Sequence, residues 1–211
     1  NLYMYRSLSY SYILILQSKY SVDAKIDELR DIYIKSMHYF LQAFNKRNPI
    51  YADILNYVSL GVLLNIPDDN FRQLIDYVKQ MDKQAKPSGW TPDLLLWFML
   101  NSRMKEQEKQ KYAETLAYPR LYNGLYKVIQ APNAATAKDA LNKYLDRWYN
   151  LNSNAPWYNS HLKDNSYRGY WAWEVAAVAK IMHIDDSDLK NNQYYPYDMV
   201  HWADNETTAK E

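Results

Sequence analysis

The chain has 211 residues, and its 25 lysines and arginines balance 24 aspartates and glutamates to a formal net charge of +1. This balance argues against a dedicated nucleic-acid-binding protein, which usually carries a clear basic excess. Because the sequence has no cysteine, disulfides, thiolate zinc sites and cysteine nucleophiles are excluded. Its four glycines form neither a P-loop nor a G-x-G-x-x-G fingerprint, and no apolar run approaches the ~18 residues of a membrane span.

Apolar residues recur at every third or fourth position along most of the chain, which predicts an all-α fold. We expect a multi-helix bundle of αα-hairpins, solenoid-like in its stacking. An N-terminal helical part is predicted for 1–48, a C-terminal helical domain for 49–205 and a frayed tail for 206–211. The longer helices are predicted at about 21–45, 50–65, 68–81, 91–100, 119–130, 134–151 and 167–183, with short ones after 185 and 197.

Three local features refine these helices. Thr91, Pro92 and Asp93 have the residue types of an N-cap followed by the first two helical positions. Gly61 lies inside a predicted helix, where it costs ~1 kcal/mol relative to alanine, so we expect a neighbouring element to cross closely there. The charged stretch 102–111 is typical of a solvated helix or bridge.

One pattern occurs twice. Asn65-Ile66-Pro67-Asp68-Asp69 and His183-Ile184-Asp185-Asp186 each follow an apolar helix and lead into a further predicted helix. The pair is consistent with two αα-hairpins of a repeat. Any helix-turn-helix with an aspartate cap has the same appearance, so the repeat stays open.

Glu174 is the most unusual ionisable residue, because the stretch from Tyr170 to Ala179 around it is otherwise apolar. A buried carboxylate must be paired or its pKa must rise. The simpler interpretation is a tie between helices through tyrosine hydroxyls or an arginine such as Arg147 or Arg168. The alternative is an enzyme that uses Glu174 with a histidine.

No metal site or cofactor is expected. The four histidines form no H-E-x-x-H pattern, and helix capping explains Asp185 and Asp186 better than a metal held with His183 does.

Charge is distributed unevenly. Residues 1–163 carry 21 basic and 15 acidic side chains, whereas residues 164–204 carry three and seven, a net charge of −4. Such an acidic, aromatic-rich end suits docking on a basic protein surface, with electrostatic steering. The 22 tyrosines are more typical of packing at the edge of a core, or of a protein interface, than of stacking on single-stranded nucleic acid.

Three segments near the C-terminus resemble the PoNe immunity protein (PoNi) family. They are the G-Y-W-x-x-E-x-A-A-x-A-K core at 169–180, the I-D-D run at 184–186 and Y-Y-P-Y-D at 194–198. Lys19-Tyr20-Ser21 followed by Ile26-Asp27-Glu28-Leu29 resembles the family's N-terminal motif more loosely and lacks a glycine expected after Ser21. This start would fit a family chain trimmed at its N-terminus.

The resemblance implies an all-helical bacterial immunity protein in the cytoplasm. It implies binding to a cognate DNase toxin of the PD-(D/E)xK type, delivered by contact-dependent, commonly type VI, secretion. Occlusion of the toxin's DNA-binding and active site would neutralise it without catalysis and without direct contact to nucleic acid or membrane. The oligomeric state stays open, with a homodimer as one option. Toxin contacts are predicted at Asp164, Asp185, Asp186, Asp188, Asp198, Trp157 and Tyr158.

The family motif residues are expected to maintain the fold, with caps at Asp185 and Asp198 and a polar tie at Glu174. These structural residues are Gly169, Tyr170, Trp171, Trp173, Glu174, Tyr195, Pro196 and Asp198. A helical-repeat scaffold or adaptor that binds a peptide or protein partner is the alternative from another functional class.

Overall fold

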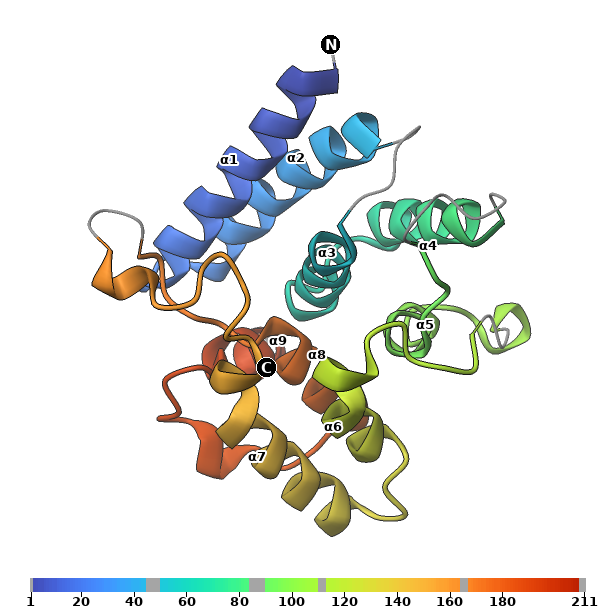
Figure 1. The fold of residues 1–211 in the computed structure, drawn as a ribbon, viewed down its shortest axis with the longest axis vertical. Coiled ribbons are helices and arrows are strands. Elements are labelled where there is room, and N and C mark those ends of the chain that lie inside the picture. The colour runs from blue at the N-terminus through green and yellow to red at the C-terminus, as the bar shows by residue number, and fades with distance from the viewer. Residues whose placement is uncertain (1, 45–49, 84–89, 110–112, 164–166, 209–211) are drawn as a thin grey trace. The chain divides into compact units, whose positions relative to one another are not determined.

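A computed structural model describes residues 2–44, 50–83, 90–109, 113–163 and 167–208 of the chain. The described residues form helices, turns and loops without strands, so the predicted all-α fold is confirmed. The chain divides into two compact units, unit 1 (Asn1–Ala117) and unit 2 (Tyr118–Glu211) (Figure 1). The expected division at residue 48 concerns domain organisation and stays a prediction.

Unit 1 begins with a hairpin of two long helices that lie side by side in the blue part of the chain in Figure 1. The sequence placed the start of its first helix at residue 21, and this was wrong. Residues 21–25 are instead the turn between the two helices, and Asp23 has a left-handed φ of 59° there. The described helical elements of unit 1 are α1 (Leu2–Tyr20), α2 (Ile26–Phe44), α3 (Tyr51–Leu63), α4 (Asp68–Lys83), α5 (Leu94–Asn101) and the 3₁₀ turn η1 (Glu106–Glu108).

The close approach predicted at Gly61 is confirmed. A Cβ atom at this position of α3 would lie 3.1 Å from the Tyr33 hydroxyl of α2 and 3.2 Å from the Phe71 ring of α4. Tyr33 is fully buried and donates to the Tyr57 carbonyl at 2.5 Å. The missing side chain therefore lets three helices of unit 1 meet at one point.

The start of α5 differs from the prediction. Asp93, not Thr91, is the N-cap, and its carboxylate accepts from the Leu96 N–H at 2.8 Å. The same buried carboxylate accepts from the Tyr51 hydroxyl at 2.8 Å and from the Ala117 N–H at 2.7 Å. Burial raises the pKa of Asp93, and these hydrogen bonds oppose the shift.

The charged stretch 102–111 is described as far as residue 109. It contains only the short turn η1, whose Glu108 accepts from Arg72 at 3.0 Å. Part of the stretch therefore bridges elements of unit 1, and residues 110 and 111 lie outside the described residues.

In unit 2, a long helix was predicted over 167–183, but α8 begins only at Trp173. Gly169 has a left-handed φ of 85°, and the Ala172 N–H donates to the Tyr194 carbonyl at 2.9 Å, so this segment is not helical. The last helix is longer than expected, reaching Thr208. The described helical elements of unit 2 are α6 (Pro119–Ile129), α7 (Ala134–Leu151), η2 (Ser160–Leu162), α8 (Trp173–Met182), η3 (Ser187–Leu189) and α9 (Tyr197–Thr208).

In unit 2, as in unit 1, a glycine lets two helices approach each other closely. In α6, a Cβ atom at Gly124 would lie only 2.2 Å from the Tyr144 ring of α7, so glycine permits this helix pair to approach. Asn133 is the N-cap of α7 and accepts from the Thr136 N–H at 2.9 Å. The predicted boundaries of α6 and α7, about 119–130 and 134–151, agree with the observed ones to within one residue.

Candidate functional site

The acidic turn, residues 183–188, connects α8 to η3 in unit 2. His183 ends α8 with a left-handed φ of 51°. The Ile184 N–H then reaches back to the Ala179 carbonyl at 3.0 Å, which satisfies an orphan group of the helix end. Because Ile184 is buried, the three aspartates that follow are held at defined positions.

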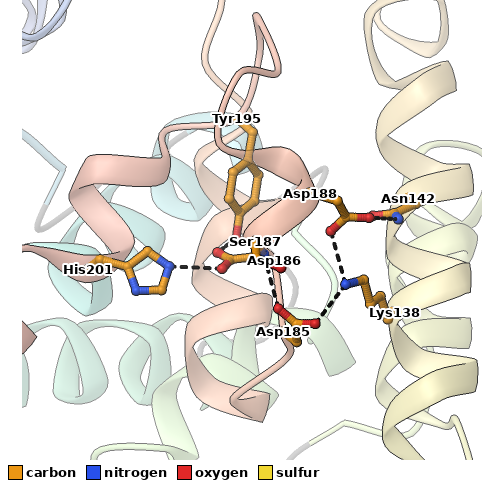
Figure 2. Close-up of polar contacts among 8 residues, drawn as sticks. All are labelled: Lys138, Asn142, Asp185, Asp186, Ser187, Asp188, Tyr195 and His201. Carbon is orange, nitrogen blue, oxygen red and sulfur yellow. Dashed lines mark hydrogen bonds and ion pairs between the residues drawn. The ribbon is translucent and has the colours of Figure 1, made fainter.

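Asp186 points into unit 2. Its side chain is buried, and it accepts from the Tyr195 hydroxyl at 2.6 Å. His201 Nε2 of α9 lies 2.8 Å from its other oxygen. Burial, followed by the hydrogen bond to Asp186, raises the pKa of Tyr195 far above its usual value. Asp186 thus joins the acidic turn to the segment that opens α9, as Figure 2 shows.

Asp185 and Asp188 point instead toward α7 (Figure 2). Lys138 Nζ lies 2.8 Å from Asp185 and 3.1 Å from Asp188, and Asn142 donates to Asp188 at 2.9 Å. Hydrogen bonds from Lys138 lower the pKa of both carboxyls, and the carboxylates raise the pKa of Lys138. Asp185 also accepts from the Ser187 N–H at 3.2 Å within the turn, but the N-cap of η3 is Asp186 and its side chain makes no capping hydrogen bond, so the cap expected at Asp185 was wrong.

The remaining acidic candidates are less connected. Asp198 is exposed in the first turn of α9 as its second residue, where a negative charge suits the helix dipole, so it is not the N-cap that was expected. Asp164 lies outside the described residues.

The net negative charge of residues 164–204 is nearly balanced by basic residues elsewhere in unit 2. Unit 2 as a whole carries ten basic and eleven acidic residues, because the segment 164–204 is folded with α6 and α7. Lys138 of α7 pairs directly with two of the aspartates. The net charge of −4 over residues 164–204 therefore does not correspond to a single acidic surface on unit 2.

The two aromatic candidates belong to a stacked cluster. The Tyr158 ring stacks on Tyr149 with 4.5 Å between centroids, and Tyr149 stacks on Tyr194 at 5.3 Å. Trp157 stacks on the buried Trp148 at 5.4 Å and leaves 36% of its own surface exposed. A rigid aromatic surface of this kind loses little side-chain entropy when a partner binds.

Comparison with known families decides the identity of this fold. The family model for the C-terminal part of PoNe immunity proteins (PoNi) matches residues 91–199, and the model for their N-terminal part matches residues 2–76. The chain belongs to the PoNe immunity protein family. The recognition based on the three C-terminal segments is therefore confirmed, and the family is one of immunity proteins against a toxin.

The fold of this family member also resembles a solved structure. The crystal structure of protein PA2201 from Pseudomonas aeruginosa matches with a TM-score of 0.72 and 19% sequence identity. The match covers 98% of this chain and 76% of that chain. At this identity the likeness concerns the fold alone. No curated protein sequence matches this chain.

The motif residues of this PoNe immunity family member have distinct places in unit 2. Gly169 supplies the left-handed backbone before α8, and Trp171 and Trp173 lie with ring centroids 6.0 Å apart. Tyr170 uses its hydroxyl to accept from the His161 N–H at 3.0 Å. Pro196 is buried beside Tyr195 and directly precedes α9. Each of these places is consistent with a role in the fold.

Glu174 ties α8 to α7, but its partner differs from those expected. The Trp148 indole donates to its carboxylate at 2.6 Å, in place of a tyrosine hydroxyl or an arginine. The residue is buried, and burial raises its pKa to about 7 despite this hydrogen bond. A buried and paired carboxyl argues against the enzyme hypothesis, which requires Glu174 in a solvent-reachable cleft with a histidine.

Sequence reasoning missed the partners of the acidic turn. Lys138 and Asn142 lie four residues apart on α7, and the i, i+4 spacing places them on one helix face. This spacing could have predicted that the two side chains share a helix face. The sequence near them does not show that this face contacts Asp185 and Asp188, which lie 47 and 46 residues after Lys138 and Asn142. Among the described residues, no group of three histidines, aspartates or glutamates is placed to hold a metal ion. No helix in the described ranges is long and apolar enough to cross a membrane.

Proposed function

We propose that this protein neutralises a cognate PoNe-type DNase toxin of the PD-(D/E)xK class by binding it, without catalysing a reaction. The observation that carries the proposal is the match of both PoNe immunity family models, which together span most of the chain. The toxin would arrive from a competing bacterium through contact-dependent, type VI-like secretion. The immunity protein would meet it in the cytoplasm.

The proposed mechanism is occlusion of the DNA-binding and active site. A nuclease surface that binds phosphates is basic, so an immunity protein benefits from exposed carboxylates. The side chains of Asp185 and Asp188 are 69% and 47% exposed although they pair with Lys138, and Asp198 is exposed. Trp157 and Tyr158 offer aromatic anchors in the same unit.

Asp186 leaves the set of proposed contacts. Its buried carboxylate is engaged with Tyr195 and His201, so it supports the turn that presents Asp185 and Asp188. A reversal of Asp186 to lysine would place a cation in the interior of unit 2, and the fold would not stay intact. This corrects the sequence-based expectation that Asp186 is a toxin contact.

A matched pair of charge reversals tests the steering idea. Asp198→Lys changes an exposed aspartate in the first turn of α9, and Asp27→Lys makes the same change in the first turn of α2. At low salt we expect Asp198→Lys to slow association with the toxin several-fold and Asp27→Lys to leave the rate near native. Equal association rates for the two variants would contradict steering by the C-terminal carboxylates.

Occlusion itself is tested by competition. Purified cognate toxin is bound to labelled DNA under conditions without cleavage, and the immunity protein is added. Occlusion predicts that DNA is released in proportion to complex formation. A ternary complex of toxin, DNA and this protein would reject occlusion while leaving inhibition by another route open. Pull-down of many partners without a nuclease would favour the scaffold hypothesis instead.

A further inference from the structure

Helix α1 exposes an uncharged, largely apolar face that none of the preceding functional arguments uses. Tyr3 is 80% exposed and Tyr10 is 63% exposed, while Met4 and Ile15 expose 46% and 44% of their surfaces. We call the outer face of α1 the exposed or half-buried residues Tyr3, Met4, Ser7, Tyr10, Ser11, Leu14 and Ile15.

This face is additional to the one that packs within unit 1. Leu16, Tyr20 and Ser9 point inward and are buried against the rest of the unit. A helix that is apolar on all sides is normally covered on all sides, because water-exposed apolar surface is unfavourable. The outer face of α1 is therefore expected to have a partner.

Charge indicates the kind of partner. Residues 2–20 contain no aspartate or glutamate, and both of their cations have partners: Lys19 pairs with Glu28 at 2.6 Å, and Arg6, an exposed residue one turn before Tyr10, interacts with Asp53. A surface without carboxylates cannot form the complementary charge contacts that a basic nuclease surface favours. It is compatible with an identical surface, since two copies meet there without repulsion between like charges.

Side-chain size indicates how two copies would meet. Tyr3, Ser7, Tyr10 and Leu14 follow the four-three-four spacing of a helix that packs along another helix. When the two helices run antiparallel about a dyad between residues 7 and 10, Tyr10 of each copy lies over Ser7 of the other. Parallel pairing would instead oppose tyrosine to tyrosine and leave a gap between serines.

We propose that the outer face of α1 forms a homodimer interface in which α1 helices of two copies pack antiparallel. The four most exposed apolar side chains of this face, Tyr3, Met4, Tyr10 and Ile15, offer roughly 450 Å² per copy when a whole aromatic side chain offers ~200 Å². Together with Ser7, Ser11 and Leu14 from each copy, the two faces bury about 1,000 Å², the lower bound for a specific interface. The interface does not rest on the proposed function, because a monomer and a dimer are equally able to inhibit a toxin.

Sedimentation velocity across a concentration series tests the proposal. We expect the native chain to dimerise reversibly and Tyr10→Glu, which brings two charges together at the dyad, to weaken dimerisation by roughly 100-fold. The matched control is Tyr167→Glu, the same substitution at a 56% exposed tyrosine in unit 2, and it should leave the dimer unchanged. Helical circular dichroism verifies that each variant is folded.

A second measurement locates the contact. Because the native chain has no cysteine, Ser7→Cys provides a single thiol at the proposed dyad, and Ser153→Cys provides an exposed thiol in unit 2. A short bifunctional thiol cross-linker should join two chains through residue 7 and not through residue 153. A native chain that stays monomeric at high concentration overturns the proposal. So does a dimer that Tyr10→Glu leaves intact or that residue 7 does not cross-link.

Discussion

Two turns, one in each unit, end a helix in the same way and then use their aspartates differently. Asn65 after α3 and His183 after α8 both have left-handed backbones, with φ of 43° and 51°. The isoleucine that follows each is buried, and its N–H returns to a carbonyl five residues earlier, that of Gly61 or Ala179. The repeated sequence pattern is therefore a repeated turn geometry.

The aspartates that stand at the third position after the left-handed residue have opposite surroundings. The Asp68 side chain is 87% exposed and pairs with Arg103, which also donates to the Ile66 carbonyl at 2.9 Å. Asp186 is buried between Tyr195 and His201. In unit 1 the turn leads into the full helix α4, and in unit 2 it leads only into η3, so the second αα-hairpin of the expected repeat is absent.

The comparison teaches that a turn pattern determines backbone geometry, whereas the segment that packs on the turn determines the role of its carboxylate. In unit 2 that segment is the stretch from Tyr195 to His201, whereas in unit 1 the turn is contacted by the Arg103 side chain. Changes at equivalent positions of the two turns should therefore have unequal effects.

The largest difference is expected between Asp186→Ala and Asp68→Ala. Removal of Asp186 leaves the buried Tyr195 hydroxyl and His201 without their acceptor, which should lower the free energy of unfolding of unit 2 by about 3 kcal/mol. Asp68 is an exposed partner, so its removal should be nearly neutral. Urea unfolding followed by circular dichroism measures both, and equal losses would show that the turns are energetically alike.

A pH-dependent difference is expected at Glu174, in the helix that enters the second turn. Its pKa rises from 4.5 to about 7 in the folded unit, so between these values the folded unit retains a proton that the unfolded chain has lost. The stability of unit 2 should therefore fall by about 3 kcal/mol as pH rises from 4.5 to 7, and level off above that.

Glu174→Gln isolates this contribution, because glutamine still accepts from Trp148 but does not ionise. We expect the variant to match the native unit in stability near pH 4.5 and to exceed it by about 3 kcal/mol at pH 8. Asn56 occupies the equivalent position in α3, and Asn56→Gln serves as the control without a pH-dependent effect. A native chain and a Glu174→Gln variant with parallel pH profiles would reject the raised pKa.

The smallest effect concerns the left-handed residues. His183→Gly removes the strain of a side chain in this backbone region and should stabilise unit 2 by about 0.5 kcal/mol, after the entropy of glycine in the unfolded chain is counted. Asn65→Gly should give no gain, because asparagine tolerates this region and its side chain accepts from Arg103 at 3.2 Å. Thermal unfolding of both variants measures the difference, and a gain at Asn65 alone would reverse this ranking.

These comparisons also show how far the sequence predicts the fold. Helices with a clear apolar stripe or a cap, such as α6 and α7, were predicted closely. Helix α1 was missed because its apolar residues lie on all sides and produce no stripe. The segment before Trp173 was taken for helix, because its conformation depends on Gly169 and on a hydrogen bond to Tyr194, which is distant in sequence.

The candidate site was predictable only in part. The aspartates were identified, but the N-cap of η3 is Asp186 and not Asp185, which only accepts from the Ser187 N–H within the turn. The burial of Asp186 was not predictable, because it depends on Tyr195 and His201, nine and fifteen residues away. The pairing of Lys138 with Asp185 and Asp188 likewise depends on how α7 packs within unit 2.

The most direct test of the central claim is a titration of the purified cognate DNase with this protein while DNA cleavage is followed. The account predicts that activity falls linearly and vanishes at one immunity chain per toxin molecule. Undiminished cleavage at an excess of folded protein would contradict it.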